Sequence, residues 1–321
     1  MITYTSISTK IGDVKEMYLR RQERTNTVRI YGYAVEKFCR DFEIIDAKEI
    51  GKIPVGFYQD WVDGLYAEGY STGTIKLYIR VISNFASYLE SYGIIENSPI
   101  LKFLTFKKET HRVTIISDGD LKALLSDDVK KLQDRLLMRT LLETGKRRGD
   151  IANIRLSDIY LVPEYDDEGN FTKMTGIVSF RNEQKTGKSN DMYVSDSFVE
   201  RFRDYVEQEE SRIGTPIPET AYLFGKHGKI QTNEDENDDK GRKNRGQNIY
   251  NRVNKICKQV GINPEDITPH VFRHTATTKI ARTKGISAAK DFGDWSSSAV
   301  MERFYYGDEE GGVVTVANGV F

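Results

Sequence analysis

Residues 270–275 read His-Val-Phe-Arg-His-Thr, and this stretch decides the fold and function that we expect. His270 and Arg273 are three positions apart in a segment of helical pattern, so their side chains share one face of the predicted helix. A planar guanidinium donates two parallel hydrogen bonds to a phosphate, and an imidazole can donate or accept a proton beside it. The pair is a candidate phosphate site, although this spacing alone is weak support.

Four other stretches give the pair a context. Residues 144–150, Thr-Gly-Lys-Arg-Arg-Gly-Asp, place an arginine in a turn after a predicted helix, where Asp150 can orient or neutralise it. Residues 184–188 place a lysine at the tip of a predicted hairpin, and Gly-Asp-Trp at 293–295 precedes Glu-Arg-Phe-Tyr-Tyr-Gly at 302–307. In chain order, the residues capable of chemistry are Arg147, Lys185, His270, Arg273, Trp295, Tyr305 and Tyr306.

Composition excludes several classes of protein. The chain has 321 residues, which suggests two domains, and no run approaches the ~18 apolar residues of a membrane span. The N-terminus is polar and has no signal-peptide core. Cys39 and Cys257 are far apart, which argues against a metal cluster or a disulfide framework and for a reducing cytoplasm.

The charge of the chain and the motifs that it lacks exclude further kinds of chemistry. Lys and Arg number 47 against 48 Asp and Glu, so the chain is not polycationic, but nucleic-acid binding needs only a local basic face. Basic residues cluster at 102–112, 146–148, 240–245 and 282–284. The sequence has no Gly-rich nucleotide loop, no His-Glu-x-x-His and no clustered Cys and His, so we expect neither a cofactor nor a metal.

The first hundred residues predict a helical domain. The clearest helix is capped by Ser71-Thr72, ends at Gly93, and carries apolar residues at steps of three and four. Its opposite face is polar and carries Lys76 and Arg80, which suits contact with a phosphate backbone, although a plain amphipathic helix fits equally well. Residues 101–115 predict a basic linker with Lys107, Lys108 and Arg112.

Residues 116–321 predict a second, mixed domain. A capping signal at Ser117 starts it, and strands at 158–162, 176–180 and 191–194 form an antiparallel meander. Residues 231–247 lack an apolar period and predict a loop. The fold class is therefore α+β and mostly helical, with an N-terminal helical domain, a linker, and a catalytic domain with a small antiparallel sheet.

The order and local context of these stretches resemble the tyrosine recombinase (phage integrase) family. The resemblance covers nearly the whole chain, with the helix at 71–93 similar to the core-binding domain of that family. Residues 144–147 resemble the first-arginine box, Lys185 the hairpin lysine, and residues 270–275 the His-x-x-Arg box. Trp295 falls where the family has His or Trp.

The resemblance implies a role for each residue. A tyrosine attacks a DNA phosphodiester and forms a 3′-phosphotyrosyl link, and Arg147 and Arg273 bind the phosphate oxygens. Lys185 protonates the leaving 5′ oxygen, His270 assists proton transfer at the nucleophile, and Trp295 packs and hydrogen-bonds through its indole. Neither metal nor ATP is required.

Two departures from the family pattern leave alternatives open. The family tyrosine usually lies nine residues after the His or Trp, but that position is Phe304. Tyr305 needs the smaller insertion and is the expected nucleophile, with Tyr306 as the alternative. The family commonly has apolar residues beside its first arginine, where this chain has Lys146 and Arg148, so Arg148 is an alternative to Arg147.

We therefore expect a site-specific DNA recombinase, the integrase of a virus or mobile element. Its expected partner is double-stranded DNA, with a homotetramer on two DNA sites, a monomer in solution and no membrane. The expected location is the cytoplasm of a prokaryotic host, at the nucleoid. Two alternatives remain: an enzyme similar to type IB topoisomerases that relaxes DNA, and a non-catalytic DNA-binding protein of the same fold.

Overall fold

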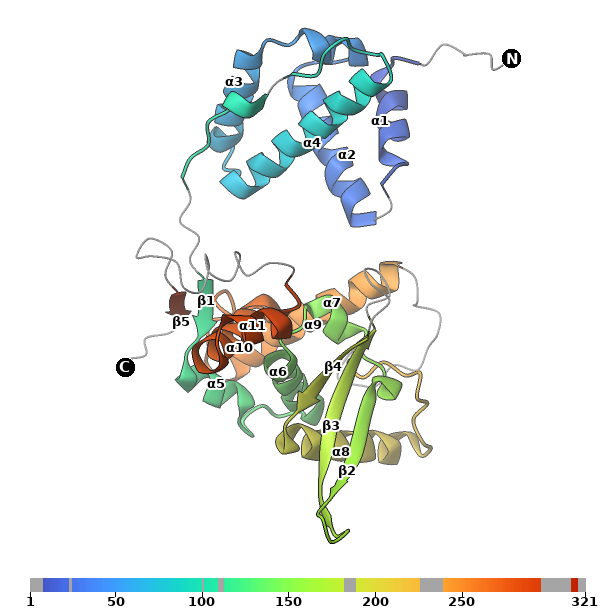
Figure 1. Cartoon of the computed structure of the whole chain (residues 1–321), viewed down its shortest axis with the longest axis vertical. Coiled ribbons are helices and arrows are strands. Elements are labelled where there is room, and N and C mark those ends of the chain that lie inside the picture. Colours follow the sequence, from blue (N-terminus) through green and yellow to red (C-terminus); the bar gives the residue numbers. More distant parts are fainter. Residues whose placement is uncertain are drawn as a thin grey trace, which may run out of the picture. The chain divides into compact units, whose positions relative to one another are not determined.

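The structure is a computed structural model that describes residues 8–22, 25–99, 101–108, 113–181, 189–225, 239–295 and 313–316. The chain divides into two compact units, Met1–Glu109 and Thr110–Phe321, which we call the N-terminal and C-terminal units. Each unit has a hydrophobic core of its own. Figure 1 shows the first as helices only and the second as helices with a small sheet.

The N-terminal unit contains helices α1 (Ile11–Leu19), α2 (Thr25–Asp41), α3 (Val55–Ala67) and α4 (Thr72–Ser91). The helix predicted after Ser71 is confirmed: the Ser71 hydroxyl accepts a hydrogen bond from the Thr74 N–H at 3.3 Å. Ile75, Phe85 and the other apolar positions of α4 are buried. The period of three and four therefore identified the face that packs into the core.

The C-terminal unit is mostly helical and contains a three-stranded sheet and a separate two-stranded one. Its helices are α5 (Asp118–Leu125), α6 (Leu132–Thr144), α7 (Arg148–Ala152), α8 (Asp196–Ile213), α9 (Asp239–Gln259), α10 (Pro269–Lys284) and α11 (Ile286–Gly293). The strands β2 (Ile159–Tyr165), β3 (Phe171–Arg181) and β4 (Ser189–Val194) pair antiparallel in chain order, so the predicted meander is confirmed. A Cβ at Gly176 of β3 would lie 2.7 Å from side chains of β4 and α8, which shows how closely α8 covers the sheet.

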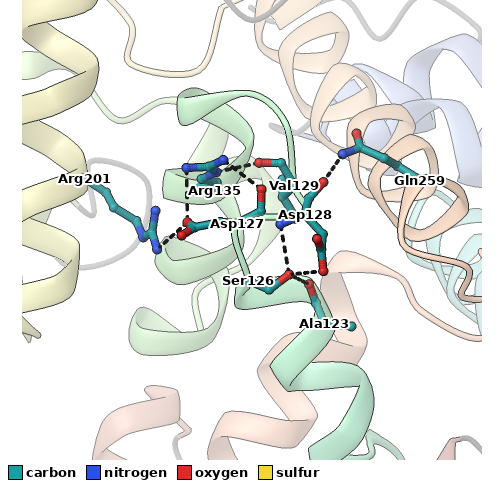
Figure 2. A network of polar contacts seen from close by, with 8 residues as sticks. All are labelled: Ala123, Ser126, Asp127, Asp128, Val129, Arg135, Arg201 and Gln259. Atoms are coloured by element: carbon teal, nitrogen blue, oxygen red, sulfur yellow. Dashed lines mark hydrogen bonds and ion pairs between the residues drawn. The ribbon is translucent and has the colours of Figure 1, made fainter.

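A polar network fixes the turn between α5 and α6 (Figure 2). Arg135 donates to the carbonyl oxygens of Val129 and Asp127 at 2.5 and 2.8 Å. The Asp127 carboxylate also accepts from Arg201 of α8 at 3.2 Å, and Gln259 of α9 donates to the carbonyl of Asp128 at 2.5 Å. These contacts tie the start of α6 to α8 and α9, so α6 is held firmly in the core of the C-terminal unit.

The predicted loop at 231–247 is wrong for its second half, because α9 begins at Asp239. Arg245 is 1% exposed and donates to Asn153 Oδ1 at 2.8 Å. Its guanidinium carbon lies 3.9 Å from the centre of the Tyr222 ring. Charged residues that predict a solvated loop are here used in tertiary contacts.

The end of the linker predicted at 101–115 overlaps strand β1 (Val113–Ile116). β1 pairs in parallel with β5 (Val313–Val316), from the far end of the chain. The Ile116 N–H donates to the Thr275 hydroxyl of α10 at 2.9 Å. A four-residue strand whose partner is so distant in sequence gives no local signal.

Candidate active site

Arg273 is the anchor of the candidate site. Its side chain is 2% exposed, and its Nη1 donates to the carbonyl oxygen of Gly145, at the end of α6, at 2.8 Å. Its Nη2 donates to the carbonyl oxygen of Gly293, at the end of α11. The guanidinium carbon lies 4.6 Å from the centre of the Trp295 ring. One arginine therefore joins the ends of α6 and α11 to α10.

Two glycines make this junction possible. Gly145 ends α6 with a φ of +57°, in the left-handed region, and a Cβ there would overlap the Phe292 ring, with Cζ only 2.7 Å away. A Cβ at Gly293 would overlap the ring of Trp295. The α6 end thus needs glycine for its conformation and for the space that Phe292 takes.

Arg147 follows this junction at the N-terminus of α7. Its backbone N–H donates to the Asp150 carboxylate at 3.2 Å, and its side chain is exposed. The contact that the structure gives for Asp150 is therefore with the backbone of the turn. Arg148, the alternative arginine, is also exposed and is the first residue of α7.

His270 lies in the first turn of α10, beside Arg273. Desolvation lowers the pKa of His270, and the positive charges of Arg273 and Arg147 lower it further. Its ring meets the His274 ring edge-on, with centroids 4.3 Å apart. Burial lowers the pKa of His274 to about 4. A neutral imidazole at His270 can accept a proton at neutral pH.

Trp295 completes the described part of the site. It is half-buried, packs against the small apolar cluster of Ala281 and Ala289, and presents its ring to Arg273. The preceding residue, Asp294, has a φ of +52°, which turns the chain sharply after α11. The structure thus brings Arg147, His270, Arg273 and Trp295 together.

Sequence reasoning did not place Lys146 in the site. Its side chain is 6% exposed, and its ammonium lies 5.5 Å from the centre of the Phe180 ring of β3. The charges that act on it include Asp294, Asp150, Arg273 and Arg147. The available signal was a lysine at a position where the resembled family has an apolar residue.

Several expected residues fall elsewhere. Lys185, Arg112, Tyr305 and Tyr306 lie outside the described residues. Lys76, Arg80, Lys107 and Lys108 are exposed on the N-terminal unit. The ammonium groups of Lys76 and Lys107 lie 5.4 and 4.5 Å from the ring centres of Phe106 and Tyr66, respectively.

The described residues contain no group of three or more His, Cys, Asp or Glu side chains arranged to hold a metal ion. Within the same ranges, none of the helices combines the length and the apolar character that crossing a bilayer requires. Cys39 and Cys257 are buried thiols, one in each unit.

Comparison with known proteins places the chain in a family. Residues 116–310, more than half of the chain, match the model of the phage integrase family. The chain therefore belongs to this family, the tyrosine recombinases. The expected family is confirmed, as is the mostly helical fold with its small antiparallel sheet.

Relatives in bacteria and archaea are distant but extensive. Tyrosine recombinase XerD of Lacticaseibacillus casei is 23% identical over 211 residues, covering 64% of this chain and 62% of that protein, less than two thirds of its length. Tyrosine recombinase XerA of Pyrococcus furiosus is 23% identical over 255 residues, covering 79% of this chain and 73% of the relative.

Solved structures agree on the fold. The Tn1549 transposon integrase in complex with transposon right end DNA has a TM-score of 0.66 at 13% identity, covering 93% of this chain and 95% of that one. XerH recombinase bound to palindromic difH substrate has a TM-score of 0.64 at 17% identity, covering 91% and 80%.

Proposed function

We propose that this protein is a site-specific DNA recombinase that cuts and rejoins DNA through a covalent 3′-phosphotyrosyl intermediate. The observation that carries the proposal is the junction at Arg273, which gathers Arg147, His270 and Trp295 in a member of the phage integrase family. Two guanidiniums and a neutral imidazole suit a phosphodiester and a hydroxyl nucleophile.

The proposed reaction exchanges one phosphoester bond for another. The hydroxyl oxygen of Tyr305, or of Tyr306, attacks phosphorus and gives its proton to His270. The bond from phosphorus to the 5′ oxygen breaks, and Lys185 protonates that oxygen. Arg147 and Arg273 bind the phosphate oxygens, on which negative charge accumulates in the transition state. Rejoining is the reverse attack by a 5′ hydroxyl, so neither a metal nor ATP enters the scheme.

We propose that DNA also contacts the N-terminal unit, in the expected domain organisation of 1–100, a basic linker at 101–115, and 116–321. Lys76, Arg80, Lys107 and Lys108 are exposed on that unit, and Arg112 follows in sequence. Phosphate contacts of this kind position the duplex without reading its sequence. The working assembly is a homotetramer on two DNA sites, and the chain serves a virus or mobile element in the cytoplasm of a prokaryote.

Covalent trapping tests the proposal. Wild type, Tyr305→Phe and Tyr306→Phe are incubated with nicked duplexes from the flanks of the protein's own gene and then run on a denaturing gel. We expect a protein–DNA adduct that only Tyr305→Phe abolishes. Loss only in Tyr306→Phe would reassign the nucleophile. No adduct on specifically bound DNA would contradict the enzyme and favour the DNA-binding module, whereas relaxation without sequence preference would favour the topoisomerase alternative.

A further inference from the structure

Lys146 is a buried cation that the proposed mechanism does not use. Its backbone follows Gly145, whose carbonyl oxygen holds Arg273, and it precedes Arg147. Its side chain turns inward and is 6% exposed, with the ammonium 5.5 Å from the Phe180 ring centre. Phe180 is itself buried near the end of β3, just before the segment that carries Lys185. Lys146 therefore lies between the turn that carries Arg147 and the end of β3.

The charged groups around Lys146 indicate its role. The groups that act on it are the carboxylates of Asp294 and Asp150 and the guanidiniums of Arg273 and Arg147. The two carboxylates and the two guanidiniums cancel in formal charge. The Lys146 ammonium therefore leaves this group of five charged side chains with one net positive charge.

Burying an ammonium costs free energy, so the need to fill space does not explain why a lysine occupies this position. Its burial lowers the pKa of Lys146, and Arg273 and Arg147 lower it further, whereas Asp294 and Asp150 oppose the change. An apolar side chain would fill the same space against Phe180 without this desolvation. A bound anion would raise the pKa of Lys146 again, because it favours the protonated lysine.

We infer that Lys146 is a positioning residue of the phosphate site, whose buried charge offsets Asp150 and Asp294 so that Arg147 and Arg273 present a net positive potential to the phosphate. The inference deepens the proposed function and rests on it for the identity of the anion. It does not require that Lys146 touches DNA.

Sulfate binding tests the charge directly, because sulfate keeps its own charge across the whole pH range of the experiment. Trp61 and Trp295 are the two tryptophans of the chain, so Trp61→Phe leaves Trp295, against Arg273, as the fluorescent reporter. In this background and at constant ionic strength, Lys146→Met should weaken sulfate binding roughly tenfold or more, as expected for one nearby charge at protein-like dielectric. Lys146→Arg should restore most of it.

The pH profile separates a charge from a packing role. Wild-type affinity for sulfate should fall at a pH below the usual lysine range, whereas Lys146→Met should be weak and lack that step. Thermal unfolding should show Lys146→Met as stable as wild type or more so. Lys122→Met, an exposed lysine of α5, removes one charge elsewhere and should leave both binding and profile unchanged.

Adduct formation on nicked DNA provides the second measurement. At saturating DNA, Lys146→Met should slow trapping by roughly 10- to 100-fold, less than or similar to the loss of a direct transition-state donor. If the wild type forms the adduct, and Lys146→Met binds sulfate and forms the adduct as well as the wild type does, the inference about Lys146 is wrong and the proposed function stands. Absence of wild-type adduct would refute the proposed function, and absence of wild-type sulfate binding would refute the inference, so the two failures are distinguishable.

Discussion

Replacing Gly145 with alanine should destabilise the C-terminal unit more than a glycine-to-alanine change at a matched helix end. An L-residue at φ +57° costs roughly 1–2 kcal/mol. The added Cβ also overlaps the Phe292 ring, and overpacking of this kind costs roughly 1–3 kcal/mol. We therefore expect a total loss of roughly 2–5 kcal/mol in the free energy of unfolding.

Gly214 is the matched control. It ends α8 with a φ of +81°, and no atom lies within 4 Å of an added Cβ, so Gly214→Ala carries only the conformational cost of roughly 1–2 kcal/mol. Urea unfolding is followed by Trp295 emission in the Trp61→Phe background, which reports on the C-terminal unit alone. In a Phe292→Ala background, the loss caused by Gly145→Ala should shrink to that of Gly214→Ala. If Gly145→Ala and Gly214→Ala lose the same unfolding free energy while Phe292 is intact, the packing of Phe292 on Gly145 is refuted.

Three further predictions concern the same unit. Asp134→Ala should cost about 3–5 kcal/mol in unfolding free energy, because Arg252, whose Nε donates to Asp134 at 2.9 Å, would remain buried without its carboxylate; if the further change Arg252→Met does not recover most of the loss in urea unfolding, this explanation is wrong. His274, with its pKa of about 4 against an ordinary 6.5, binds a proton more readily when unfolded, so stability should fall by up to about 1.4 kcal/mol per pH unit between pH 6.5 and 4. His274→Asn should flatten that slope, and an unchanged slope would assign it to other groups. Thr275→Val should speed hydrogen exchange of the Ile116 amide and cost about 1–3 kcal/mol, and unchanged exchange would show that this amide does not depend on the hydroxyl.

Much of the fold could be predicted because its signals are local. The apolar period of α4 and its Ser71 cap depend on neighbours within one or two turns, and the three strands of the meander are consecutive in the chain. The start of α9 and the pairing of β1 with β5 could not be predicted. Each depends on a partner far away in sequence: Asn153 and Tyr222 for Arg245, and residues 313–316 for β1.

The candidate site divides in the same way. His270 and Arg273 belong to one short motif, so the sequence showed both. Lys146 sits in a basic run of three, which reads as surface, and only the position of Phe180 reveals that its side chain turns inward. The acceptors of Arg273 gave no signal at all, because a carbonyl oxygen is present in every residue.

The backbone acceptors of Arg273 affect how the site tolerates mutation. Two of the groups that hold Arg273 are peptide oxygens, of Gly145 and Gly293, and no side-chain deletion removes a peptide oxygen. The orientation of the arginine is therefore insensitive to most substitutions around it. Its weak points are the two glycines, where any larger residue displaces the oxygen by displacing the chain. Genetic variation at this site should accumulate in the surrounding side chains and be rare at these two backbone positions.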